Sequence, residues 1–158
     1  IWSVPLALFL GLVFDIESSI LGSLAFIFGG FWLSPDLDTQ SGALKRWGIL
    51  KSLWGPYRTL IRHRSILSHG PLLGTGLRLI YLMTSIALIL FFLAPIGVPE
   101  PINTGKALLE LSKLYPQRTL AIILGLEASA WLHLIKDGDP LPIEWSKKKD
   151  LNKKSPKP

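Results

Sequence analysis

The sequence predicts an all-α integral membrane protein, a helical bundle with about four transmembrane helices. Of its 158 residues, 49% are hydrophobic, a high fraction for a soluble domain of this size. The apolar residues gather in four runs, at 1–14, 18–33, 71–94 and 119–135. Polar and basic segments separate these runs, as expected of a chain that crosses a bilayer repeatedly.

The run at 71–94 is the clearest membrane span, because crossing the hydrocarbon core takes about 20 residues. It carries one charge, Arg78, which we expect to reach the headgroups or to face a polar site. The runs at 1–14 and 18–33 are shorter, and a tight turn at 15–17 would pair them as a helical hairpin. The first residue is Ile inside an apolar run, so we expect the N-terminus to be truncated. A cleaved signal peptide is the alternative for that run.

The charge pattern predicts the organisation and topology of the chain. We expect residues 1–140 to form the membrane-embedded domain, with 39–69 as a basic loop and 95–118 as an external loop. Residues 141–158 form a lysine-rich tail that we expect to be disordered. Lysine and arginine near the helix ends place the basic loop and the C-terminus in the cytoplasm, which makes this a multi-pass protein of the cell membrane. Within the loop, an interfacial amphipathic helix over 45–60 is expected, and a nucleic-acid patch is the less favoured interpretation.

Three polar clusters stand at the ends of apolar runs. Because the chain has no cysteine, any metal must be held by histidine, carboxylates and water. Each cluster alone has an ordinary structural explanation, such as a helix-end turn or a surface histidine. The predicted topology, however, brings all of them to the cytoplasmic ends of helices, which indicates one metal site. Its candidate ligands are Asp36, Asp38, His63, His69, His133 and Asp137.

The spacing within the clusters suggests roles. Asp36 and Asp38 are two residues apart, so in an extended segment both point the same way and would share one or two cations. His133 and Asp137 are four apart and stack on one helical face, where they would ligate one ion or orient one another. Glu127 lies deeper in the same run; it is either a functional carboxylate or a partner for Arg78 across the bundle.

Arg62 and Arg64 flank His63, and guanidinium groups grip phosphate through two parallel hydrogen bonds. They are therefore candidates for binding a phosphate group, with ordinary headgroup anchoring as the alternative.

Three motifs carry a resemblance to a known family. These are Ser-Pro-Asp-Leu-Asp at 34–38, His-Arg-Ser-Ile-Leu-Ser-His-Gly-Pro at 63–71, and Glu-x-x-x-x-x-His-x-x-x-Asp at 127–137. In this order the chain resembles a bacterial family of uncharacterised metal-binding membrane proteins, the domain of unknown function 2227. That family looks related to the YdjM-type membrane-bound metal-dependent hydrolases. The resemblance implies that the six candidate ligands surround the metal, and it implies no substrate. The family usually begins with a His-Asp segment that this chain lacks.

These observations together predict a metal-dependent hydrolase that acts at the cytoplasmic face, with phosphoesters as the expected substrates. The metal would be divalent, zinc or manganese, with Asp36 or Asp38 as general base and Glu127 as a further catalytic candidate. The expected partners are the lipid bilayer and an anionic lipid or other phosphoester. The alternatives are a metal-binding membrane protein without catalysis, such as a sensor, carrier or assembly factor, a basic membrane anchor that binds anionic lipid or nucleic acid, and a soluble helical enzyme.

Overall fold

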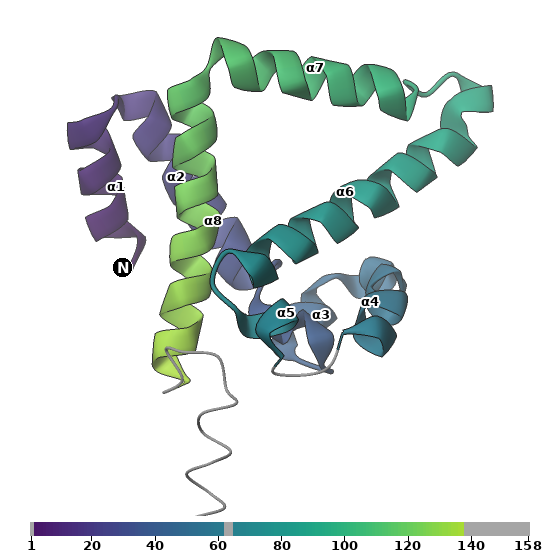
Figure 1. Cartoon of the computed structure of the whole chain (residues 1–158), viewed down its shortest axis with the longest axis horizontal. Helices are drawn as coiled ribbons and strands as arrows, with labels where there is room; N and C mark the ends of the chain where they lie inside the picture. Colours follow the sequence, from purple (N-terminus) through teal and green to yellow (C-terminus); the bar gives the residue numbers. More distant parts are fainter. Residues whose placement is uncertain (1, 62–64, 138–158) are drawn as a thin grey trace, which may run out of the picture.

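The computed structural model describes residues 2–61 and 65–137, and every regular element in these residues is a helix. The all-α class is therefore confirmed for the part of the chain that the structure describes (Figure 1). The predicted tail at 141–158 lies outside these residues. The elements are α1 (Ser3–Val13), α2 (Ile16–Phe31), η1 (Pro35–Asp38), α3 (Gly42–Arg46), η2 (Gly48–Trp54), α4 (Gly55–Leu60), α5 (Ile66–His69), α6 (Leu73–Leu93), η3 (Ala94–Ile96), α7 (Pro101–Leu114) and α8 (Pro116–Lys136).

Helices α1 and α2 form the hairpin that the sequence predicts. Asp15 caps α2, since its carboxylate accepts a hydrogen bond from the Ser18 amide at 2.7 Å. That amide holds the pKa of Asp15 below its ordinary value. The Ser19 hydroxyl then donates to the carbonyl oxygen of Ala7 across the hairpin at 2.6 Å, which fixes the two helices against each other.

Helices α2 and α8 form the most extensive helix contact in the described chain, and they run parallel. At their first turns Glu17 pairs with Arg118, and at their last turns α2 leads into η1 beside His133. Glycines allow the close approach: a Cβ atom at Gly125 would collide with the carbonyl oxygen of Gly22, and one at Gly29 with the hydroxyl of Ser129. The small residues of the 18–33 run thus let α2 pack closely against α8.

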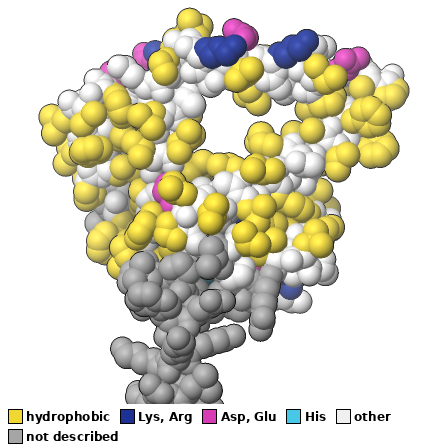
Figure 2. Space-filling view, viewed as in Figure 1, with side chains coloured by type: hydrophobic (Ala, Val, Ile, Leu, Met, Phe, Trp, Pro, Cys, Tyr) yellow, Lys and Arg dark blue, Asp and Glu magenta, His cyan; other side chains and the backbone are white. Residues whose placement is uncertain are grey.

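Helix α6 departs from this pair. It touches α8 near its own beginning and then diverges, so that α6, α7 and α8 enclose a triangle of ribbons in Figure 1. In the most apolar stretch of α6 only 6% is buried inside the protein, whereas the corresponding share for α8 is 39%. Helix α7 lies across the far ends of α6 and α8, and the charged side chains on that edge gather over α7 in Figure 2.

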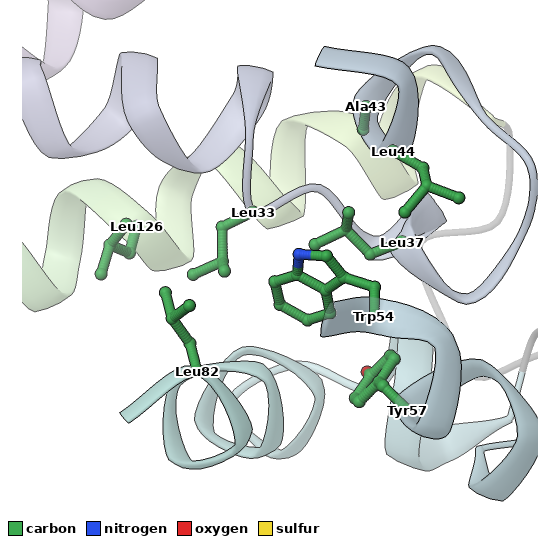
Figure 3. Close-up of a cluster of buried hydrophobic side chains, with 8 residues drawn as sticks. All are labelled: Leu33, Leu37, Ala43, Leu44, Trp54, Tyr57, Leu82 and Leu126. Carbon is green, nitrogen blue, oxygen red and sulfur yellow. The ribbon is translucent and has the colours of Figure 1, made fainter. Parts of the chain in front are cut away.

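Residues 42–60 fold into α3, η2 and α4 beneath the ends of α2, α6 and α8. The prediction of one amphipathic helix over 45–60 is wrong, because the chain forms three short helices whose aromatic side chains pack against one another. The ring of Trp54 lies 5.3 Å from Trp47 and 5.4 Å from Tyr57, between ring centres, and both Trp54 and Tyr57 are buried. Burial raises the pKa of the Tyr57 hydroxyl. Figure 3 shows the resulting hydrophobic cluster, which comprises Leu33, Leu37, Ala43, Leu44, Trp54, Tyr57, Leu82 and Leu126.

Within residues 2–61 and 65–137, three helical segments are long and apolar enough to cross a membrane: Ile16–Asp38, Leu73–Ile96 and Pro116–Lys136. Helix α1, with 11 residues, is shorter than a span. A bundle of about four spans therefore stays a prediction, whereas three helices of spanning length and composition are present.

Candidate metal centre

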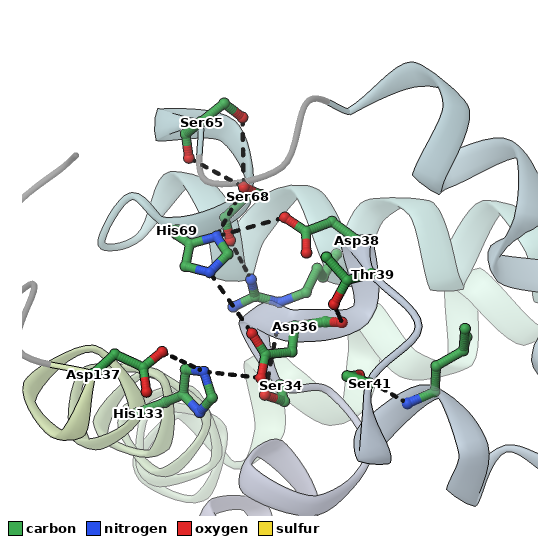
Figure 4. A network of polar contacts seen from close by, with 12 residues as sticks. Ser34, Asp36, Asp38, Thr39, Ser41, Ser65, Ser68, His69, His133 and Asp137 are labelled. Carbon is green, nitrogen blue, oxygen red and sulfur yellow. Dashed lines mark hydrogen bonds and ion pairs between the residues drawn. The ribbon is translucent and has the colours of Figure 1, made fainter. Parts of the chain in front are cut away.

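Polar side chains from η1, α5 and α8 converge where these three elements end, as Figure 4 shows. Helix α8 contributes His133, and Asp137 directly follows its last residue. The two aspartates Asp36 and Asp38 come from η1, and His69 comes from α5. Five of the six ligands predicted from sequence thus lie together. The sixth, His63, and the two arginines Arg62 and Arg64 lie outside the described residues.

The turn after α2 places the two aspartates. Pro35 begins η1, where its missing amide costs no hydrogen bond, and Ser34 caps the turn by accepting from the Asp36 amide at 3.5 Å. The Thr39 hydroxyl donates to the carbonyl oxygen of Asp36 at 3.1 Å and closes it. As a result the Asp36 side chain is partly exposed, whereas the Asp38 side chain is buried.

One imidazole nitrogen faces two carboxylates. His133 Nε2 lies 3.3 Å from Asp36 Oδ2 and 3.2 Å from Asp137 Oδ2, and Asp137 is one helical turn after His133. This nitrogen is buried, and both contacts are ion pairs when the imidazole is protonated. Ligand atoms of Asp36, His133 and Asp137 all lie within 4.8 Å of one another, so these three side chains can hold a metal ion.

A second histidine stands on the other side of Asp36. His69 Nε2 lies 3.9 Å from Asp36 Oδ1, and its Nδ1 lies 3.6 Å from Asp38 Oδ2 and 2.9 Å from the Ser68 hydroxyl. Asp36 therefore lies between the two imidazoles, with one oxygen toward each. Contacts at Nδ1 fix the orientation of the ring and direct Nε2 toward Asp36.

Arg78 supports α5 from within α6. Its guanidinium is buried and donates to the carbonyl oxygen of Ser68 at 2.6 Å and to the Thr75 hydroxyl at 3.2 Å. The sequence allows Arg78 either to reach the headgroups or to face a polar site, and in the structure its side chain faces the polar site. Sequence reasoning did not assign Ser68 a role, and the signal available for it was its position directly before His69.

Glu127 is not brought together with the other candidates. It is buried on α8, and its Oε1 accepts a hydrogen bond from the Leu72 amide at 2.8 Å, just before α6. Leu72 has a φ of 60°, a strained value for a residue with a branched side chain, and this hydrogen bond secures it. The contact links α8 to the start of α6, in place of the ion pair with Arg78 considered from sequence.

Comparison with known proteins gives three findings. An uncharacterised protein of Aquifex aeolicus (strain VF5) is 47% identical over 60 residues, which is 37% of this chain and 42% of the relative. The aligned part thus spans less than half the length of that relative. No solved structure matches the chain. The family of uncharacterised metal-binding proteins known as DUF2227 matches residues 1–148, and the chain therefore belongs to this family.

Proposed function

We propose that this protein spans a membrane and binds one divalent cation through Asp36, His133 and Asp137. The observation that carries the proposal is the position of the buried His133 Nε2, which lies 3.3 Å from a carboxylate oxygen of Asp36 and 3.2 Å from one of Asp137. Two carboxylates that converge on one imidazole nitrogen repel each other, and a cation held between the three side chains would remove that repulsion.

The ligand set fits zinc or manganese. Bonds of about 2.0–2.1 Å to zinc place neighbouring ligand atoms roughly 3.3 Å apart around a tetrahedron. The two distances from His133 Nε2, 3.3 and 3.2 Å, agree with that spacing. One imidazole with two carboxylates also suits manganese, which accepts more oxygen ligands. The description of the family as metal-binding supports a metal site and names no metal.

Membrane placement is supported by the three helices of spanning length and by the position of α7. With these helices across the bilayer, α7 would lie along one surface and the metal centre would lie at the other. The excess of lysine and arginine between residues 45 and 58 supports a cytoplasmic position for the metal side.

A hydrolytic role is the extension that the site favours. Three protein ligands leave a coordination position open, which is the arrangement of catalytic rather than structural zinc sites. When bound, such an ion lowers the pKa of water and polarises a phosphoryl oxygen. In this chain His69 would accept the proton, since Asp38 and Ser68 hold its Nδ1 and its Nε2 faces the site. Asp38 would then orient His69 rather than act as the base itself.

The proposed substrates are the phosphoesters expected from sequence, and Arg62 and Arg64 are their proposed binding residues. A relation of the family to the YdjM-type hydrolases is part of the same proposal. A non-catalytic metal carrier or sensor is the second candidate, because the same three ligands would serve it.

The deciding experiment is metal content of the detergent-purified full chain by elemental analysis. We expect about one equivalent of zinc or manganese, and loss of at least about 100-fold in affinity in His133→Ala. Met83→Ala, on the exposed part of α6, is the matched control and should keep the metal. Equal, negligible metal in the wild type and His133→Ala after reconstitution would overturn the metal site. If metal binds but no lipid or nucleotide phosphoester is hydrolysed, the hydrolase extension fails and the non-catalytic function stands.

A further inference from the structure

A groove runs along the side of the protein away from the metal ligands, between α1 and α8. Helix α2 contacts both helices and forms its base, with Phe26 in the middle. Two adjoining hollows of about 680 and 480 Å³ make up the groove, and they share Trp2, Phe26 and Leu132. The larger hollow is lined almost wholly by apolar side chains, including Phe9 and Trp131. Figure 2 shows hydrophobic side chains spread over this side of the molecule.

Two cations stand at one end of the groove, in the smaller hollow. Lys136 Nζ lies 5.7 Å from the ring centre of Trp2. The Arg46 guanidinium lies 4.9 Å from the ring centre of Phe31 and donates to the Phe31 carbonyl oxygen at 3.1 Å. Among the described residues neither cation is paired with a carboxylate. Their positive charge is therefore available to an anion that approaches this end.

Glu127 makes the two ends of the groove differ in charge. It is the one acidic residue among the side chains that line the two hollows, and it lies in the apolar part, away from the cations. Its carboxylate would repel an anionic group placed there. The groove thus accepts apolar material along most of its length and negative charge at the end formed by Arg46 and Lys136.

We propose that this groove binds one anionic phospholipid, with an acyl chain along Phe9, Phe26 and Trp131 and the phosphate between Arg46 and Lys136. The inference rests on the membrane placement proposed above. It does not rest on the metal, because none of Asp36, His133 and Asp137 lines the groove. Lys136 directly precedes Asp137, so the lipid headgroup lies in the same leaflet as the metal centre.

The test is lipid retention by the full chain, measured by native mass spectrometry from detergent with equimolar phosphatidylglycerol and phosphatidylcholine. Each cation near an anionic headgroup favours binding, so we expect retention of phosphatidylglycerol about tenfold above phosphatidylcholine. In an Arg46→Ala/Lys136→Ala variant the ratio should fall close to one. A Lys106→Ala/Lys113→Ala variant removes two cations from α7, at the opposite surface, and should leave the ratio unchanged. Equal retention of both lipids by the wild type, or an unchanged preference in the Arg46→Ala/Lys136→Ala variant, overturns the proposal.

A second measurement locates the acyl chain. Phosphatidylglycerol brominated in its acyl chains should quench tryptophan fluorescence, and Trp131→Phe should lose part of that quenching. Ala128→Phe narrows the apolar hollow and should reduce retention of the lipid without loss of helical circular dichroism. If Trp131→Phe shows the same quenching as the wild type, or Ala128→Phe retains lipid fully, another segment or partner occupies the groove and the proposal is wrong. Metal content measured on the same samples separates this outcome from failure of the metal site.

Discussion

The segment from α2 through η1 (Ile16–Asp38), helix α8 and the segment that begins with α6 (Leu73–Ile96) all have the length and composition of membrane spans, but they are surrounded very differently. Within the most apolar part of each, 28% of the first segment and 39% of α8 are buried, against 6% for α6. The α2–α8 pair meets through glycine and serine and carries three candidate ligands at its end, whereas the single charge of α6, Arg78, lies in its first third. The two segments with small and polar residues thus pack against each other and carry the candidate ligands. The most apolar segment is left the most exposed.

This contrast predicts a large difference between two helical glycines. Any Cβ atom at Gly125 meets the backbone of Gly22, whereas a Cβ atom at Gly76 on α6 has no atom within 4 Å. We expect Gly125→Ala to destabilise the protein by about 3 kcal/mol, because backbone cannot move aside as a side chain can. Gly76→Ala should be neutral or stabilise by about 0.5–1 kcal/mol, since alanine favours the helix. Thermal unfolding in detergent, followed by circular dichroism, measures both. Equal effects would mean that α2 and α8 do not pack closely.

A pair of leucines tests whether α6 packs against the hydrophobic cluster through its first half and not through its second half. Leu82 is buried and belongs to the cluster with Leu33 and Leu126, whereas Leu88, further along α6, is 55% exposed. Leu82→Ala should therefore cost about 2 kcal/mol through the cavity it leaves. Leu88→Ala should change the stability by less than about 0.5 kcal/mol. The same unfolding measurement applies, and a large effect of Leu88→Ala would show that α6 packs along its length, which would remove the contrast with α8.

Much of the fold follows from local sequence signals. Apolar runs bounded by proline and charge predict the long helices, and the four-residue spacing of His133 and Asp137 predicts their stacking on α8. The fold of residues 42–60 does not follow, because tryptophan and tyrosine next to lysine suit both a membrane surface and a buried cluster. Only tertiary contact decides between them: Trp54 and Tyr57 pack on Tyr81, which lies on α6 and is distant in the chain.

The sequence predicts which residues are candidates for the site, but it does not predict how they are arranged. That Asp36 lies between His69 and His133 depends on how η1, α5 and α8 meet, and no spacing in the chain encodes this. The different exposure of Asp36 and Asp38 is equally invisible in sequence, because both follow the same proline within three residues. For Glu127 the sequence indicates more, because a carboxylate within an apolar run requires a buried partner. It does not show that this partner is the Leu72 amide.

The smallest expected effect is a change in metal affinity, and it compares Ser68 beside the metal ligands with Ser85 on α6. Both hydroxyls form local hydrogen bonds. The Ser68 hydroxyl lies 2.9 Å from His69 Nδ1 in the polar cluster, while the Ser85 hydroxyl donates to the Tyr81 carbonyl oxygen on α6 at 2.9 Å. Ser68→Ala removes one contact that orients His69 beside Asp36. Because one such hydrogen bond contributes about 1 kcal/mol, we expect metal affinity to fall about fivefold.

Ser85→Ala removes a hydrogen bond of the same length that does not involve the metal ligands or His69. It should therefore leave the metal affinity unchanged. Competition with a chelator measures both variants. If Ser68→Ala binds metal as the wild type does, the Ser68 contact does not help to position Asp36, and the contact of His69 with Asp38 is enough to orient the ring. Metal affinity would then be as insensitive to Ser68 as to Ser85, and this point of the contrast between the two regions would fail.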